Sequence, residues 1–289
     1  MEKQKKAYLC ASVAVLFWAT SASVFKITLR YVDVFSLLFY ASITSTVAFF
    51  VYILISNKLG LLKDLSRKDY LYSALLGFLN PFLYYAVLFR AYSILPAQEA
   101  QPLNFIWPIT LVLLSIPLLK QKIKSKDIIA TFIGFTGVFV ISTRGDIFGF
   151  RFTNTLGVSL ATGSSIIWAL FWIYNVRDKR DEVIRLFLNF TFGSVLTLVL
   201  MLLFSNSRIP NLYGILGAVY VGLFEMGITF LLWLKALRLS KTTAHVTNLI
   251  YMVPFLSLVL IWLTVGEAIL PSTIVGLILI VGGIIYQRF

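Results

Sequence analysis

The sequence predicts an all-α integral membrane protein with ten transmembrane helices, arranged as an inverted five-plus-five repeat with both termini cytoplasmic. Three observations support this fold class. The 289 residues are 59% hydrophobic and 13% charged, whereas soluble domains are nearer a quarter charged. The apolar residues form ten separate runs, and Lys and Arg gather in every second connection between them. Segments of the first half also recur in the second half at an offset of about 145 residues, which is too long for a solenoid repeat.

The ten apolar runs are candidates for membrane-spanning helices, which need about 20 mostly apolar residues. The runs are residues 7–25, 34–56, 70–92, 97–119, 128–142, 155–175, 183–204, 212–234, 242–265 and 272–286. Because the loops between them are short, we expect one compact membrane domain without a separate soluble domain.

Positive charges predict the orientation of these spans. Of the 25 Lys and Arg residues, nineteen lie at the two termini and in every second loop, and six lie in the remaining loops. Since cytoplasmic loops carry the excess of Lys and Arg, both termini are predicted to be cytoplasmic. Five spans is an odd number, so the second repeat starts on the opposite side of the membrane. The predicted domains are therefore a five-helix repeat at residues 1–145 and an inverted copy at residues 146–289.

The strongest internal similarity pairs residues 104–121 with residues 248–267. Each copy has an asparagine, then an aromatic residue, then a proline: Asn104, Trp107 and Pro108 in the first, and Asn248, Tyr251 and Pro254 in the second. A proline inside a transmembrane helix bends the helix and frees backbone carbonyl groups. We therefore predict helix kinks at Pro108 and Pro254, and a further kink at Pro81 in the third span.

Further motifs carry a resemblance to a known family. They are Phe17-Trp18-Ala19-Thr20 with Lys26 in the first span, and Pro254, Gly266-Glu267, Gly276 and Gly282-Gly283 in the last two. These motifs resemble the drug/metabolite transporter (DMT) superfamily, in particular its EamA-type ten-helix permeases. Within that superfamily, residues 99–122 and Ile167-Trp168-Ala169 resemble the YddG type of aromatic amino-acid exporter. The resemblance covers nearly the whole chain and implies transport of a small organic solute.

We expect a secondary transporter that works by alternating access in the plasma (inner) membrane. The first hypothesis is export of aromatic or hydrophobic amino acids. The alternatives are another metabolite class, such as a nucleoside, S-adenosylmethionine or a cationic drug, and a membrane scaffold without transport activity. ATP is not the expected driver, because the chain has no Walker-type glycine loop. The expected partners are a small-molecule substrate and the lipid bilayer, with the chain as a monomer or homodimer.

Composition argues against other functional classes. The net charge of +13 is spread over short loops and does not accompany a nucleic-acid-binding module, so we expect no nucleic-acid partner. Cys10 is the only cysteine and His245 is the only histidine. This excludes an intrachain disulfide and a cysteine metal cluster, and it leaves few residues for an enzyme active site. We therefore expect no enzymatic activity, no cofactor and no metal.

The candidate substrate-binding residues are those predicted to lie near the bilayer midplane, where the sites of inverted-repeat transporters lie. Their depth follows from a rise of about 1.5 Å per helical residue. The candidates are Trp18, Asn80, Tyr84, Asn104, Trp107, Trp168, Trp172, Glu225, Asn248 and Tyr251. Such aromatic and amide side chains suit an apolar pocket with a few hydrogen-bonding groups. Their structural alternatives are interface anchoring for tryptophan and hydrogen bonding between helices for asparagine.

Glu225 is the strongest candidate for a functional residue, because it is an acid in the middle of an apolar span. A charged side chain at the bilayer centre costs about 2.5–3.5 kcal/mol on insertion scales and usually faces a cavity. Glu225 is therefore a candidate for proton coupling or for binding a substrate ammonium group, and its structural alternative is a hydrogen bond to a neighbouring helix. Glu99 and His245 are the other coupling candidates, with helix capping as the alternative for His245. Glu267 is expected to be a structural cap or loop anchor.

Overall fold

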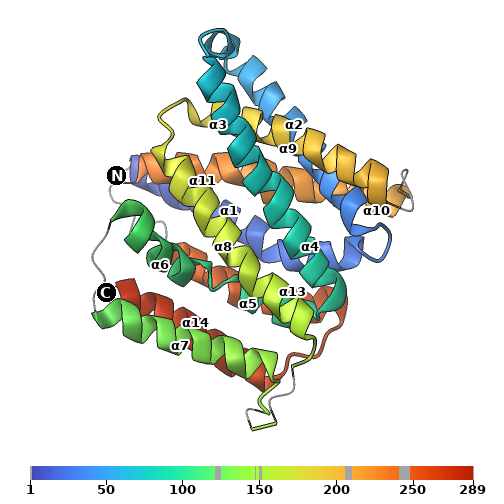
Figure 1. Cartoon of the computed structure of the whole chain (residues 1–289), viewed down its shortest axis with the longest axis vertical. Helices are drawn as coiled ribbons and strands as arrows, with labels where there is room; N and C mark the ends of the chain where they lie inside the picture. Colours follow the sequence, from blue (N-terminus) through green and yellow to red (C-terminus); the bar gives the residue numbers. More distant parts are fainter. Residues whose placement is uncertain are drawn as a thin grey trace. The chain divides into compact units, whose positions relative to one another are not determined.

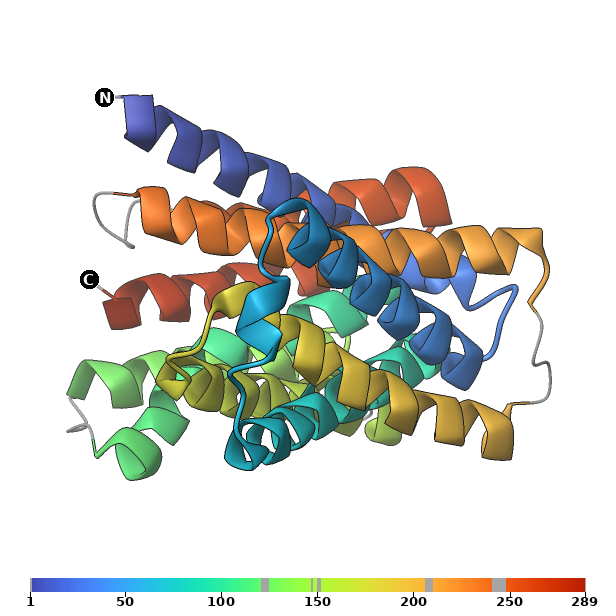
Figure 2. The ribbon, with the colours of Figure 1, turned by 90° about the horizontal axis from the view of Figure 1, so that it is seen from above.

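The computed structural model describes residues 2–120, 125–146, 148–149, 152–205, 210–240 and 248–288. These residues form helices and connecting loops (Figure 1, Figure 2). The α-helices are α1 (Glu2–Thr28), α2 (Val34–Ile55), α3 (Arg67–Gly77), α4 (Tyr84–Ile94), α5 (Ala97–Asn104), α6 (Trp107–Leu119), α7 (Ser125–Ser142), α8 (Thr155–Arg177), α9 (Glu182–Phe204), α10 (Leu212–Tyr220), α11 (Ile228–Leu239), α13 (Val253–Val265) and α14 (Pro271–Arg288). Between them lie the 3-10 turns η1 (Leu59–Leu62) and η4 (Asn248–Met252) and the wider π-type turns η2 (Phe78–Leu83) and η3 (Val221–Gly227).

The helices have the length and composition of a membrane protein. Within the described residues, seven helical stretches are long and apolar enough to cross a bilayer: Glu2–Thr28, Val34–Ile55, Arg67–Ile94, Ala97–Leu118, Thr155–Asn175, Glu182–Phe204 and Leu212–Ala236. Three more apolar helices are shorter, namely Ile128–Ser142, Leu249–Val265 and Pro271–Tyr286. The predicted all-α membrane architecture is confirmed at this level.

The chain divides into two compact units. The first unit comprises residues 1–86 and 178–257, and the second comprises residues 87–177 and 258–289. Each unit therefore combines helices from both halves of the sequence.

In the first unit, α2 and α9 pack side by side and run in opposite directions (Figure 1). Asp33 caps the start of α2, and the Ser205 hydroxyl at the end of α9 donates to Asp33 Oδ2 at 2.6 Å. At the other end, Asp181 caps the start of α9, and Lys58 Nζ lies 2.6 Å from Asp181 Oδ2. An aspartate at a helix start satisfies free backbone N–H groups, so each cap also ties its helix to the end of the partner helix.

The middle of the α2–α9 pair is held by smaller polar and aromatic contacts. The hydroxyl groups of Thr46 and Ser194 lie 3.0 Å apart. One turn further along, the rings of Phe49 and Phe190 meet edge to face with centroids 5.2 Å apart, a favourable geometry for two aromatic rings. The two helices are therefore paired over most of their length.

A second helix pair in the first unit joins α1 to α11, which lie side by side in Figure 2. The core of this pair consists of Ala11 and Ala14 on α1 and Trp233 and Ala236 on α11, all buried. Small residues at a helix interface let the backbones approach closely. The alanines of α1 thus make room for the large Trp233 ring.

Two glycines bring the π-type turns against neighbouring backbones. A Cβ atom at Gly77, just before η2, would clash with the carbonyl oxygen of Asn189 on α9. A Cβ atom at Gly222, within η3, would lie 2.5 Å from the carbonyl oxygen of Ala41 on α2. Ser45 on α2 donates its hydroxyl to the Gly222 carbonyl at 2.7 Å. Each turn is therefore packed directly on the backbone of α2 or α9.

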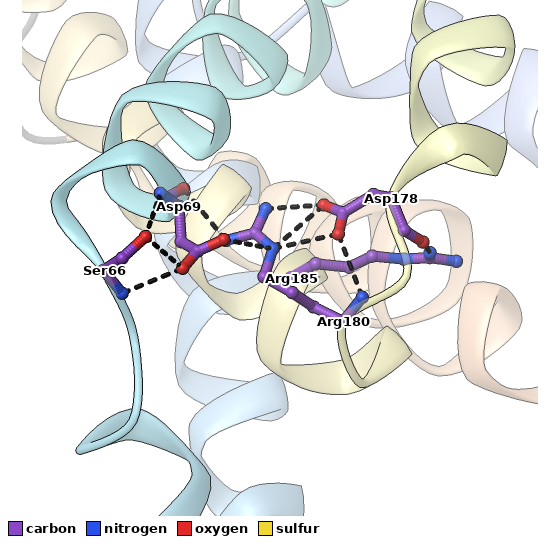
Figure 3. Close-up of polar contacts among 5 residues, drawn as sticks. All are labelled: Ser66, Asp69, Asp178, Arg180 and Arg185. Atoms are coloured by element: carbon purple, nitrogen blue, oxygen red, sulfur yellow. Dashed lines mark hydrogen bonds and ion pairs between the residues drawn. The ribbon is translucent and has the colours of Figure 1, made fainter.

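Loop contacts in the first unit surround Arg180, as Figure 3 shows. Arg180 pairs with Asp178, with Nη2 2.5 Å from Oδ2, and also donates to the backbone carbonyl of Asp69 at 2.9 Å. Asp69 forms a capping box with Ser66 at the start of α3. Arg185 donates to the Asp178 carbonyl at 2.5 Å. Arg185 lies in the first turn of α9 and is buried.

We predict that Asp178→Asn destabilises the protein by about 1.5–3 kcal/mol at neutral pH, because it weakens charge-assisted hydrogen bonds. Burial opposes the charge of Asp178, but hydrogen bonds and the charge of Arg180 outweigh it and hold the pKa of Asp178 below its ordinary value of 3.8. A lowered pKa in the folded state gives stability that is present above the unfolded-state pKa and lost as the pH falls through the folded-state pKa.

Thermal unfolding in detergent from pH 7 to pH 3 checks this prediction. The difference in Tm between wild type and Asp178→Asn should be largest at pH 7 and shrink below about pH 4. Asp64→Asn, in the exposed loop before α3, is the matched control and should leave Tm unchanged. An equal Tm of wild type and Asp178→Asn at pH 7 would contradict the role of this ion pair.

In the second unit, α7 and α14 lie side by side (green and red in Figure 1). Their closest approach is at two glycines. A Cβ atom at Gly137 would lie 2.5 Å from the carbonyl oxygen of Gly276, and one at Gly276 would lie 2.6 Å from the carbonyl oxygen of Gly137. Glycines at helix interfaces in membranes permit such backbone contact.

We predict that Gly137→Ala destabilises the second unit by about 1–3 kcal/mol, because the added methyl group overpacks a backbone contact. Gly282→Ala, on α14, is the control, since a Cβ atom there meets nothing within 4 Å in the described structure. Alanine also favours a helix by about 1 kcal/mol over glycine, so Gly282→Ala should keep or raise Tm. Equal unfolding temperatures for the two variants would contradict the close contact of α7 and α14.

Candidate functional site

The carboxyl group of Glu225 is the centre of a polar cluster in the first unit. Glu225 lies in η3 and is 8% exposed. Ser21 on α1 donates its hydroxyl to Oε2 at 2.5 Å, and Tyr85 on α4 donates its hydroxyl to Oε1 at 3.1 Å. Both carboxyl oxygens therefore have a hydroxyl donor, which offsets part of the cost of burying this group.

Aromatic rings stand beside this cluster. The indole nitrogen of Trp18 donates to the backbone carbonyl of Glu225 at 3.3 Å. The Trp18 ring also meets Trp233 and Phe230 edge to face, with centroids 5.3 Å and 6.4 Å apart. An acid next to aromatic rings is a suitable surrounding for an organic ammonium group, which is attracted both by the carboxylate and by ring faces.

The sequence pattern predicts Glu225 and Trp18 as site residues, but it does not predict the two hydroxyl groups that bind Glu225. Ser21 lies three residues after Trp18, so both fall on the same face of α1, and this spacing is a signal that could have identified it. Tyr85 was overlooked in favour of its neighbour Tyr84. The two rings meet at 4.7 Å, but it is Tyr85 whose hydroxyl reaches Glu225.

The other predicted residues of the first unit are more scattered. Asn80 lies in η2 and is fully buried, and within the described structure neither polar atom of its side chain has a hydrogen-bond partner. Tyr251 lies in η4 and is half-buried. The side chain of Asn248 and the whole of His245 lie outside what the structure describes.

The predicted residues of the second unit form a tryptophan cluster. The Trp168 ring on α8 meets Trp107 on α6 with centroids 6.5 Å apart and Trp172 with centroids 5.7 Å apart. Asn104, at the end of α5, donates its amide to the Ser164 hydroxyl on α8 at 2.8 Å. The structure thus brings these predicted residues together around α8.

Two acids of the second unit have clear structural partners. Glu99, in the first turn of α5, is fully buried, and its Oε1 lies 2.9 Å from Arg144 Nε at the end of α7. Glu267 accepts hydrogen bonds from the backbone N–H groups of Ala97 and Gln98, both at 3.0 Å. Glu267 therefore caps α5. Among the described residues, no group of three His, Cys, Asp or Glu side chains could hold a metal ion.

The three prolines predicted as kinks accompany breaks in the helices. Pro81 lies inside η2 and follows a cis peptide bond from Asn80. Pro108 is in the first turn of α6, directly after the chain leaves α5. Pro254 is in the first turn of α13, directly after η4. Pro108 and Pro254 thus begin helices, a position that tolerates the missing N–H of proline.

The family comparison matches two segments of the chain. The EamA-like transporter family matches residues 5–143 and residues 155–287. The chain belongs to the EamA-like transporter family. This confirms the resemblance to the drug/metabolite transporter superfamily, and the protein is a multi-pass membrane transporter of the EamA family.

Individual relatives of this EamA transporter are distant. An uncharacterized transporter of Clostridium kluyveri is 26% identical over 180 residues, which cover 57% of this chain and 55% of that protein, so the match spans about half of its length. The aromatic amino acid exporter YddG of Ancylobacter novellus is 26% identical over 206 residues, 70% of each chain. A crystal structure aligns with a TM-score of 0.67 over 98% of this chain and 96% of that chain, at 22% identity. That likeness concerns the fold alone.

Proposed function

We propose that this EamA transporter exports aromatic or other hydrophobic amino acids across the plasma membrane by alternating access. Its ten spans form two inverted five-helix repeats, with both termini in the cytoplasm and the repeats meeting near residue 145. The single observation that carries the proposal is the buried carboxyl group of Glu225, held by Ser21 and Tyr85 in the interior of a membrane-spanning helix. Ionisable groups in such positions are functional by default.

The two π-type turns support the inverted repeat. Gly77 and Gly222 are separated by the repeat offset of about 145 residues, and so are Asn80 and Glu225. Gly77 packs on the α9 backbone and Gly222 packs on the α2 backbone. Since α2 and α9 would be the second span of each repeat, their opposite directions are those that inversion requires.

The chemistry of the Glu225 cluster supports a substrate that carries an ammonium group. A carboxylate has about four lone-pair sites, and Ser21 and Tyr85 use one on each oxygen. The remaining sites can accept either a proton or a substrate ammonium group. If proton and substrate bind there in turn, inward proton movement can drive outward movement of the substrate.

The proposal that the substrate has an aromatic or hydrophobic side chain is supported by Trp18 and by one related transporter. Trp18, whose indole nitrogen donates to the Glu225 backbone carbonyl, offers an apolar surface for an aromatic side chain in the first unit. The similarity to the YddG aromatic amino acid exporter is in keeping with this. A cationic drug or another ammonium-bearing metabolite is the second candidate, because it would use the same carboxyl group.

The substrate class can be tested by counterflow in proteoliposomes. The panel consists of labelled phenylalanine, tryptophan, methionine, a nucleoside and an organic cation. We predict that the amino acids accumulate several-fold above protein-free liposomes and that the nucleoside does not. Accumulation of the organic cation alone would keep the Glu225 site and reject amino-acid export. Absence of flux for every solute would favour the non-transporting scaffold.

We predict that Glu225→Gln abolishes accumulation driven by a pH gradient, because glutamine keeps the shape of the side chain but cannot exchange a proton. The measurement is uptake into proteoliposomes with and without the gradient. Glu99→Gln is the matched variant. Its carboxyl group is already paired with Arg144, so pH-driven accumulation should persist. Wild-type pH dependence in Glu225→Gln would remove this residue from the mechanism.

A further inference from the structure

A groove on the first unit lies between α2 and the η3–α11 segment. Its volume is about 550 Å³, within the usual range for small-molecule sites. Residues of α2, among them Ala48 and Val51, form one wall, and Leu223, Ile228 and Leu231 form the other. The groove runs beside the turn that holds Glu225, since Leu223 and Glu225 belong to the same turn. It takes no part in the hydrogen bonds of Glu225.

The walls of the groove are apolar and open. Val47, Val51 and Ile55 on α2 are 55%, 44% and 76% exposed. Thr44 contributes little polarity, because its hydroxyl donates to the Tyr40 carbonyl of the same helix at 2.7 Å. As α2 is long and apolar enough to cross a membrane, this open apolar surface faces hydrocarbon.

Near the end of α2 the groove wall includes a tyrosine, and an exposed lysine lies one turn beyond Leu231, the last lining residue of α11. Tyr52 lines the groove near the end of α2 and is partly exposed. Lys235 is exposed and follows Leu231 by one turn of α11, so it continues the stripe of Ile228 and Leu231 beyond the groove. In the described part of the chain, no carboxylate pairs with Lys235, whereas Lys58 is occupied by Asp181.

We propose that this groove binds one acyl chain of an anionic phospholipid, with the phosphate group at Lys235 and Tyr52. An apolar groove with a tyrosine near one end and an exposed lysine beyond it complements a lipid chain that ends in a charged headgroup. Tyrosine is common at the level of lipid headgroups, and a lysine near the membrane surface favours anionic lipids. Under the proposed topology, the charged end lies at the cytoplasmic leaflet.

We favour a lipid as the ligand because the side chains change from apolar along the groove to polar and charged beyond one end. A soluble ligand would leave most of the exposed apolar wall uncovered. An apolar helix of a second copy would gain nothing from an exposed lysine beyond one end of the groove. The lipid site does not depend on which solute is transported, so its test can succeed or fail independently of the proposed function.

The test is native mass spectrometry of the full chain, purified in mild detergent with an equimolar mixture of phosphatidylglycerol and phosphatidylcholine. Wild type should retain one phosphatidylglycerol in preference to phosphatidylcholine. Ala48→Phe fills the groove and should reduce retention about tenfold, because the buried apolar area of the chain is lost. Val195→Phe, at an exposed apolar position of α9, is the control and should retain lipid as wild type does.

The headgroup contact is tested separately. Lys235→Gln should keep a bound lipid but lower the preference for phosphatidylglycerol over phosphatidylcholine about fivefold, the effect of one lysine near the surface. If Ala48→Phe is not monodisperse, Val51→Trp blocks the same groove from its rim. Wild-type retention in the groove-filling variant, or an unchanged headgroup preference in Lys235→Gln, would overturn the proposal. A lipid-free dimer that Ala48→Phe converts to a monomer would also overturn it.

Discussion

The burial of one carboxyl group within a membrane-spanning segment is the constraint on which the proposed site depends. Glu225 costs free energy in an apolar surrounding, and the fold offsets part of this cost with hydroxyl donors from two other helices, Ser21 on α1 and Tyr85 on α4. The π-type turn η3 sets the position of Glu225, and Gly222 allows that turn to lie against the backbone of α2. The hydrogen bonds of Glu225, the position of η3 and the packing of η3 on α2 therefore depend on one another.

The α2–α9 pair supports the other elements of the first unit. Each helix starts at an aspartate cap, and each cap is bound by the end of the other helix, through Ser205 in one case and Lys58 in the other. Such reciprocal contacts fix two antiparallel helices in register without a long polar seam, which would be costly in lipid. Both π-type turns pack on this pair, so a displacement of α2 or α9 would move the segment that carries Glu225.

The sequence predicts the membrane-spanning helices more completely than it predicts the residues of the candidate site. Long apolar runs and sparse charges predict membrane-spanning helices because lipid permits few other structures, and an acid within such a run identifies Glu225. The spacing from Trp18 places Ser21 on the same face of α1, but the sequence does not show that it reaches Glu225. Many serines and tyrosines occur in these runs, and the packing of the helices brings Ser21 and Tyr85 to the carboxyl group. Pro108 and Pro254 were predicted as kinks, and each lies at a break, in the first turn of the helix that follows it.

The proposed transport cycle requires that a proton and a substrate ammonium group exchange at Glu225. Infrared difference spectroscopy of the reconstituted protein measures this most directly, because a protonated carboxyl group has a carbonyl band that a carboxylate lacks. The account predicts that addition of phenylalanine to wild type removes this band as the substrate displaces the proton, and that Glu225→Gln lacks the change. An unchanged carboxyl band in wild type during substrate binding, or the same loss of the band in Glu225→Gln, would contradict the account.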